Sequence, residues 1–167
     1  MDVIAFAAEK HRDQRRKDQH ETPYINHPIG VAMILYREAG ISDEDILKAA
    51  ILHDTVEDTE TTFVELEKHF GSVVTSYVRE KTDDKTLSKI ERKRFQIEHA
   101  PNASYGAKLI GLADKIYNLR DLSKGIPVGW DSTRVHEYFV WAKQVCEGYG
   151  RVDRHLWIIL DDLFKDI

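Results

Sequence analysis

The sequence predicts an all-α protein, a helical bundle that forms a single domain over residues 1–167. Apolar residues recur at intervals of three and four along most of the chain, which is the spacing of one helix face. The strict alternation that marks a strand is absent almost everywhere, and no internal repeat is visible. Hydrophobic residues make up 42% and charged residues 32%, which is typical of one globular domain.

Periodicity predicts where the first helices lie, and proline and glycine predict where they begin and end. Val3 begins an amphipathic pattern that predicts a helix ending near Lys17, followed by a loop over 18–26. Pro28 favours the first position of the next helix and pushes His27 towards an extended conformation, which places His27 at the mouth of that helix. Gly40 is expected to end it.

The later helices have recognisable start and stop signals. Ser42 with Asp45 resembles a capping pair for a helix that continues through 53, and Thr62 begins a short helix that Gly71 ends. Further helices are expected over 73–81, 87–99, 103–123, 132–147 and 152–164.

Composition excludes several classes of protein. Cys146 is the only cysteine, so no internal disulfide can form, and we expect a buried thiol. The apolar start has no preceding basic residue and no stretch approaches about 20 apolar residues, so we expect no signal peptide, no membrane segment and a cytosolic location. The net charge of -5 argues against nucleic-acid binding, whereas the basic cluster Arg12, Arg15, Arg16 and Lys17 could hold a phosphorylated small molecule. The oligomeric state stays open.

The segment 53–58 places four ionisable groups directly after the apolar run 49–52. On a continuous helix His53 and Glu57 share one face, and Asp54 and Asp58 share the adjacent one. A single metal centre could meet both faces. The alternative interpretation is a helix end that emerges into solvent and binds no metal. Acidic residues are unfavourable at such an end because of the helix dipole, and a nearby cation removes that penalty.

Asp114 borders the apolar face of its helix, and a carboxylate at such a border needs a partner. With Asn118 and Asp121 it could also form an ordinary solvated stripe. Two imidazoles and two carboxylates suit a first-row divalent ion, and this nitrogen and oxygen mixture fits manganese or iron better than a thiolate-rich zinc site. The remaining histidines have no comparable companions and are expected at the surface or half-buried.

The motifs resemble those of the HD superfamily, specifically the hydrolase domain of RelA/SpoT homologues. Stand-alone small alarmone hydrolases, including the animal-type SpoT homologue, are the nearest match. The matching segments are His27-Pro28, 53–59, 112–115 and 118–122, and the similarity runs from Arg15 to Phe139.

The resemblance implies a Mn²⁺-dependent hydrolase that removes pyrophosphate from the 3′ position of guanosine tetraphosphate or pentaphosphate. It also implies a role for each matching residue. The metal ligands would be His27, His53, Asp54 and Asp114, the catalytic pair Glu57 and Asp58, and the substrate contacts Arg16, Lys17, Lys89, Asn118, Arg134 and Tyr138.

Some of these residues have simpler interpretations. Arg16 and Lys17 could be solvated at a helix end. Residues 89–94 could form a solvated basic helix face, and the resemblance assigns a substrate contact only to Lys89 among them. Tyr138 and its aromatic neighbours could belong to the core. Asp121 stands where the long enzymes carry a hydroxyl residue that helps to hold guanine, which leaves base selectivity open.

Other activities also stay open. The chain has no room for the synthetase domain of the long relatives, so we expect breakdown of the nucleotide and not its synthesis. The nearest alternative is an NADPH 2′-phosphatase or another HD-type nucleotide phosphohydrolase. A metal-holding regulatory module without turnover is a further alternative, against which the intact Glu57 and Asp58 count.

Overall fold

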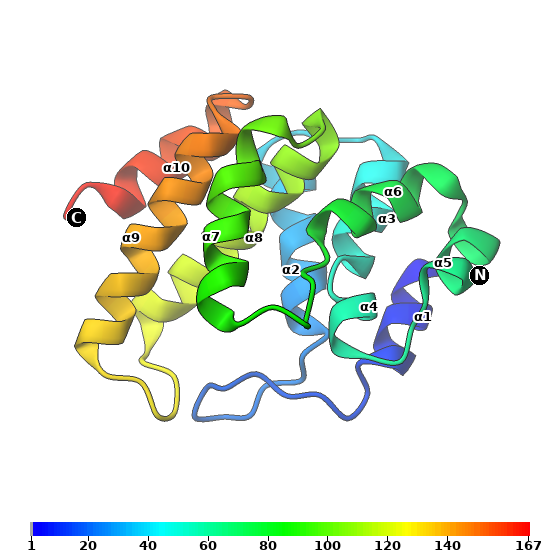
Figure 1. Cartoon of the computed structure of the whole chain (residues 1–167), viewed down its shortest axis with the longest axis horizontal. Coiled ribbons are helices and arrows are strands. Elements are labelled where there is room, and N and C mark those ends of the chain that lie inside the picture. Colours follow the sequence, from blue (N-terminus) through cyan, green and yellow to red (C-terminus); the bar gives the residue numbers. More distant parts are fainter. Residues whose placement is uncertain (1) are drawn as a thin grey trace.

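The computed structural model of the protein describes residues 2–167, which fold into helices joined by loops (Figure 1). Within this range there is no β-strand, and the only extended pairing is an isolated antiparallel bridge between Arg15 and Pro23. The all-α prediction is therefore confirmed.

The helices follow one another along the chain, and the longest connection is the loop over 11–25 between the first two. They are α1 (Val3–Lys10), α2 (Asn26–Met33) with its π-helical extension η1 (Ile34–Glu38), α3 (Glu44–Leu52), α4 (Thr55–Asp58), α5 (Phe63–Phe70), α6 (Ser72–Lys81), α7 (Lys89–His99) with the 3-10 turn η2 (Ala100–Asn102), α8 (Tyr105–Lys124), α9 (Ser132–Tyr149) and α10 (Arg154–Phe164).

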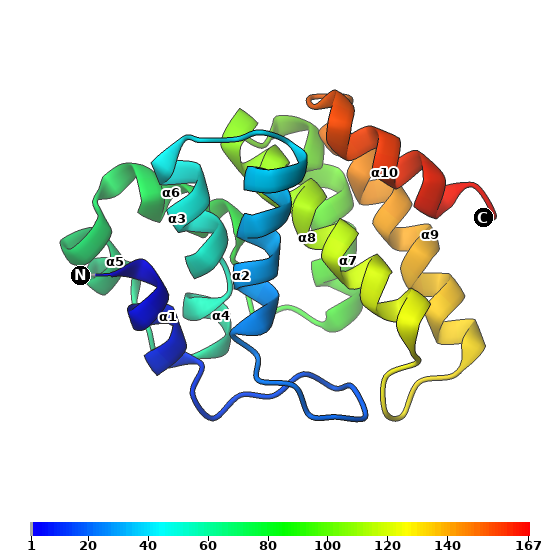
Figure 2. The ribbon, with the colours of Figure 1, turned by 180° about the vertical axis from the view of Figure 1, so that it is seen from behind.

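Helix α2 lies between two groups of helices. Figures 1 and 2 show α1, α3, α4, α5 and α6 on one side of it and α7, α8, α9 and α10 on the other, with the two chain ends at opposite extremes. Helix α2 packs on both α3 and α8. A Cβ atom at Gly30 would collide with the ring of Tyr117, so glycine allows α2 and α8 to approach closely. This contact brings the first turn of α2 to the middle of α8.

The core runs through both groups of helices. Helix α8 contributes Leu109, Leu112, Ile116 and Leu119, each of which is fully buried. Burying a side chain of this size stabilises the fold by roughly 1.5–3 kcal/mol. The middle of α8 is therefore held rigidly, and the polar residues at the edge of its buried face have defined positions.

The first helix is shorter than predicted. It ends at Lys10 rather than near Lys17, and the residues after it form a loop that hydrogen-bonds to itself. The backbone N–H of Arg16 donates to Thr22 O at 2.8 Å, and that of Tyr24 donates to Gln14 O at 3.0 Å. These bonds satisfy backbone groups that a longer helix would have used, so the loop has a defined shape.

Two other helix starts differ by one or two residues from the prediction. Helix α2 begins at Asn26, so His27 lies within its first turn instead of being extended. Pro28 is tolerated there because the first N–H groups of a helix have no partner within it. The cap of α3 is Asp43 rather than Ser42, since Asp43 Oδ1 accepts from the N–H of Asp45 at 2.9 Å.

Other boundary signals are confirmed. Thr62 caps α5 by accepting from the N–H of Glu65 at 3.1 Å. Gly40 and Gly71 end their helices with φ values of 68° and 90°, a left-handed region that favours glycine. The helices predicted over the second half of the chain are all present, with ends that differ by one or two residues.

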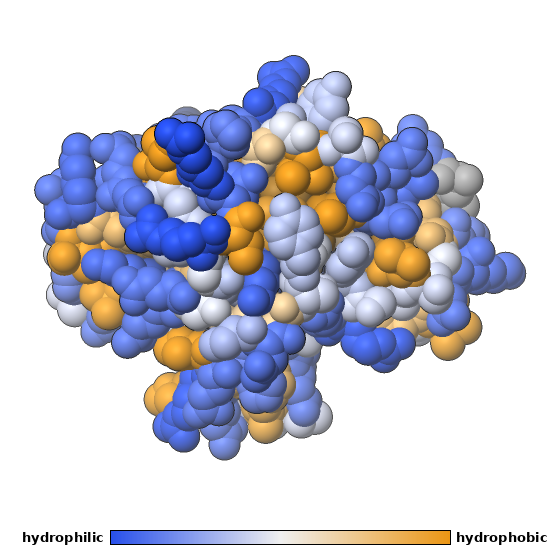
Figure 3. Space-filling view, turned by 90° about the horizontal axis from the view of Figure 1, so that it is seen from above, coloured by the Kyte–Doolittle hydropathy of each residue, from blue (hydrophilic) through white to orange (hydrophobic). Residues whose placement is uncertain are grey.

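The surface shows hydrophobic residues in several separate groups among hydrophilic ones on the face seen in Figure 3. Among residues 2–167, no helix combines the length and the apolar character that crossing a bilayer requires.

Candidate active site

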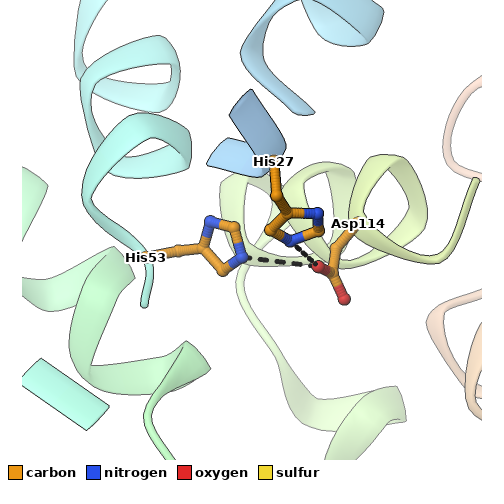
Figure 4. A group of neighbouring side chains, drawn as sticks. All are labelled: His27, His53 and Asp114. Carbon is orange, nitrogen blue, oxygen red and sulfur yellow. Dashed lines mark hydrogen bonds and ion pairs between the residues drawn. The ribbon is translucent and has the colours of Figure 1, made fainter. Parts of the chain in front are cut away.

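Three separate parts of the chain meet at one point. His27 comes from the first turn of α2, His53 from the turn after α3, and Asp114 from the middle of α8 (Figure 4). His27 Nε2 lies 2.9 Å and His53 Nε2 3.4 Å from the same oxygen, Oδ1 of Asp114. Their ligand atoms all lie within 4.8 Å of one another, which is the size of a coordination sphere.

The predicted continuous helix over 53–58 is wrong. Helix α3 ends at Leu52, a turn follows, and α4 begins at Thr55. The Thr55 hydroxyl donates to Leu52 O at 2.7 Å, and His53 Nδ1 lies 2.6 Å from Ala50 O. Because these side chains bond to the last carbonyls of α3, the helix stops and the chain turns. The turn directs His53 and Asp54 to the same point, which a continuous helix would not have done.

Asp54 completes the group of four predicted ligands. Its Oδ2 atom lies 3.1 Å from His53 Nε2 and 3.6 Å from His27 Nε2. Tyr24, from the loop before α2, donates its hydroxyl to the same oxygen at 2.6 Å. The four residues predicted as metal ligands are therefore brought together, with Tyr24 as an additional neighbour.

The donor set of this group fits a divalent cation. Because His53 Nδ1 faces a carbonyl oxygen and carries a proton, Nε2 is the ring atom that faces Asp54 and Asp114, and it is buried without a hydrogen-bond partner among residues 2–167. Burial opposes a charge on His53, yet the two carboxylates outweigh burial and raise its pKa. The point between these side chains therefore attracts positive charge, and two nitrogens with carboxylate oxygens suit a first-row divalent metal.

Lys115 holds the second oxygen of Asp114. Its buried Nζ lies 2.9 Å from Asp114 Oδ2 and 4.9 Å from the centre of the Trp141 ring. Burial would raise the pKa of Asp114, but Lys115 and then the histidines hold it well below its usual value. Sequence reasoning missed Lys115, although a lysine on the apolar face of α8, directly after Asp114, was a visible signal.

The two predicted catalytic carboxylates have different surroundings. Glu57 lines the same cleft as the cluster, and its Oε1 accepts from the backbone N–H of Asp83 at 2.7 Å. Burial raises the pKa of Glu57 to about 7, which suits a group that exchanges a proton near neutral pH. Asp58 is exposed and is not among the residues that line the cleft, and Gln14 Nε2 donates to its Oδ2 at 3.3 Å.

A cleft of about 780 Å³ joins the cluster to most of the predicted substrate contacts. Its lining includes Arg16, Lys89, Asn118, Arg134 and Tyr138. Lys17 lies outside it and lines a second cavity of about 700 Å³, which shares Arg16, Asn118 and Tyr138 with the first. The six predicted contacts therefore surround two adjoining cavities, and a nucleotide-sized ligand can reach both.

Arg16 is held in place between the two cavities. Its Nη2 donates to Asn118 Oδ1 at 3.1 Å and to Asp121 Oδ2 at 2.9 Å. Its guanidinium carbon lies 5.8 Å from the centre of the Tyr24 ring and 5.6 Å from that of Tyr117. Arg16 is thus not solvated at a helix end, and Asp121 serves as its partner.

Part of the cleft lining is basic and aromatic. Lys93 Nζ lies 4.7 Å from the centre of the Trp141 ring and 5.7 Å from that of Tyr138, so these half-buried aromatics line the cleft as well as packing on the core. Burial, and then the nearby Lys89 and Arg134, lower the pKa of Lys93. Sequence reasoning selected only Lys89, although Lys93 is one helical turn further on the same face.

The remaining histidines and the cysteine are mostly as predicted. His20, His69, His99, His136 and His155 are exposed. His11 is the exception, because it is 1% exposed, and its assignment to the surface or a half-buried position was wrong. Cys146 is buried as expected, and burial raises its pKa to about 12.

Comparisons with known proteins found a matching family and similar proteins. A family model described as HD domain matches residues 4–135. A human protein named guanosine-3′,5′-bis(diphosphate) 3′-pyrophosphohydrolase MESH1 is 60% identical over 165 residues, which cover 99% of this chain and 92% of that protein.

Two solved structures are similar as well. One, described as a metazoan ortholog of SpoT that hydrolyzes ppGpp, has a TM-score of 0.96 at 53% identity and covers 98% of this chain and 92% of that chain. The other, lmo0812 from Listeria monocytogenes, has a TM-score of 0.69 at 32% identity and covers 86% of this chain and 96% of that chain.

Proposed function

Because this chain belongs to the HD domain family, we propose that it is a metal-dependent hydrolase that converts guanosine 3′,5′-bis(diphosphate) to GDP and pyrophosphate, and the pentaphosphate to GTP and pyrophosphate. One observation carries the proposal: the His and Asp cluster and Glu57 line the same cleft as Lys89, Lys93 and Arg134. The name of the human relative, 60% identical, supports the same reaction. The domain extent, 1–167, and a cytosolic location stay predictions.

The metal is proposed to be Mn²⁺, held by His27, His53, Asp54 and Asp114. Nitrogen and oxygen donors without thiolates favour manganese or iron over a structural zinc site. When bound, such an ion polarises phosphoryl oxygens and lowers the pKa of coordinated water. Lys115 keeps one oxygen of Asp114 directed at the histidines by bonding to the other.

Glu57 is proposed to take the proton of the attacking water. Its pKa of about 7 allows it to be ionised at neutral pH and to release the proton again. The N–H of Asp83 fixes one of its oxygens and leaves the other available. Asp58, at the edge of the site, is proposed to orient the water or the leaving group.

The nucleotide is proposed to span both cavities. Lys89, Lys93 and Arg134 supply positive charge for phosphates that do not react, while Arg16 and Asn118 lie where the cavities meet and suit the nucleoside. The reacting 3′ diphosphate would lie beside the cluster.

A substrate panel tests this proposal. Purified protein with added Mn²⁺ is given guanosine tetraphosphate and, separately, NADPH, and pyrophosphate and orthophosphate are measured independently. We expect GDP and intact pyrophosphate from the first substrate. Release of orthophosphate from its 5′ end, or no turnover, would contradict the proposal. Orthophosphate and NADH from NADPH alone would support the 2′-phosphatase alternative instead.

A further inference from the structure

Tyr24 contacts the candidate metal cluster without belonging to it. Its hydroxyl donates at 2.6 Å to Asp54 Oδ2, the oxygen that faces both His53 and His27. A carboxylate on a short side chain can rotate about its last bond, so a donor at one oxygen limits which oxygen faces the histidines. Tyr24 is therefore in a position to orient Asp54.

The ring of Tyr24 is itself held on two sides. Its centre lies 5.0 Å from the ring centre of the buried His11 and 5.6 Å from that of His27. His11 is fixed in turn, because its Nδ1 lies 2.8 Å from Gln14 Oε1. The Gln14 carbonyl accepts the backbone N–H of Tyr24 at 3.0 Å, which ties the loop to the same support.

The two carboxylates of the cluster have different partners. Asp114 Oδ2 is bonded to Lys115, a cation, whereas Asp54 Oδ2 is bonded to a neutral hydroxyl. Lys115 therefore compensates the charge of Asp114, while Tyr24 leaves the charge of Asp54 available. Removing the Tyr24 hydroxyl deletes a hydrogen bond to Asp54 without changing the number of charges around the cluster.

We propose that Tyr24 is a positioning residue that orients Asp54 for metal binding, and that His11 and Gln14 hold it in place. The inference rests on the proposed function only in taking Asp54 as a metal ligand. Partners of this kind typically change metal affinity by about 10- to 100-fold when they are removed. The effect belongs to metal binding and needs no substrate to be observed.

The test is a metal titration of the purified full chain after removal of bound metal. The Kd for Mn²⁺ is measured for wild type, for Tyr24→Phe, and for Tyr36→Phe as the matched control, because Tyr36 is 57% exposed and lies in η1, beyond the end of α2 that is remote from His27. Phenylalanine keeps the ring contacts of Tyr24 and deletes only the hydroxyl. We expect Tyr24→Phe to raise the Kd about 10- to 100-fold, with Tyr36→Phe unchanged and both variants as thermally stable as wild type.

A double variant separates a positioning role from a general structural one. If Tyr24 acts through Asp54, adding Tyr24→Phe to Asp54→Ala should change the remaining Mn²⁺ affinity by less than about two-fold. Independent effects that add in the double variant, or a Tyr24→Phe protein that binds Mn²⁺ as tightly as wild type, would overturn the inference. Absence of metal binding in the wild type would instead contradict the proposed function.

Discussion

The substitution Glu57→Gln should stabilise the metal-free protein more at pH 8 than at pH 5. Burial raises the folded-state pKa of Glu57 to about 7, above the ordinary value of 4.5. A raised carboxyl pKa means that the stability associated with this group is fully present below pH 4.5 and is lost as the pH rises through 7. Glutamine keeps an oxygen for the N–H of Asp83 and never ionises, so the variant does not lose this stability.

The size of the effect follows from the two pKa values. The difference between 4.5 and about 7, at about 1.4 kcal/mol per pH unit, corresponds to about 3 kcal/mol. Glu57 is only half-buried, and solvent screening reduces the expected gain to about 1–2 kcal/mol at pH 8. Near pH 5 the folded group is mostly neutral, and the gain should be smaller.

Urea unfolding of wild type, Glu57→Gln and Glu60→Gln measures this effect directly. Glu60 is exposed and close in sequence, so its substitution controls for a general change of charge. All three proteins are stripped of metal, because a bound cation would itself favour the ionised form of Glu57. The reasoning would be refuted if the free energies of unfolding of Glu57→Gln and wild type differed equally at both pH values, or if wild type were the more stable protein at pH 8.

Four further predictions concern the same site. Glu57→Gln should keep the metal and lose on the order of 10² to 10⁴ in kcat, whereas turnover within a few-fold of wild type would contradict a proton-transfer role. Asp54→Ala should bind Mn²⁺ too weakly to retain it through purification and should lose activity, and a stoichiometric ion found by elemental analysis would remove Asp54 from the ligand set. Lys89→Ala should raise KM for guanosine tetraphosphate much more than it lowers kcat, because Lys89 lines the cleft and is proposed to hold a phosphate that does not react; the reverse pattern would place it at the reacting phosphate. Lys115→Met should destabilise the metal-free fold by about 3–5 kcal/mol in urea unfolding, since it leaves Asp114 without its buried partner, and a loss below about 1 kcal/mol would show that the pair is solvated.

The identity of the candidate cluster was visible in the sequence, because His27, His53, Asp54 and Asp114 stand in a recognisable order next to apolar helix faces. The helical class was equally visible, since a spacing of three and four residues is a local property of the chain. What failed was the local geometry between Leu52 and Thr55. Periodicity cannot show that a threonine hydroxyl bonds to a helix carbonyl and ends the helix there.

The sequence by itself determined which residue types are present, in which order, and on which helix faces they lie. Only the tertiary structure decided which of them meet. Lys115 and Tyr24 were missed because each acts on a carboxylate through a side-chain contact that neither helical periodicity nor a motif reveals. His11 was assigned to the wrong environment for the same reason, since it is buried against the ring of Tyr24, which comes from the loop before α2. Helical periodicity is set within a few residues, whereas burial and ion pairing depend on packing between segments that are far apart along the chain.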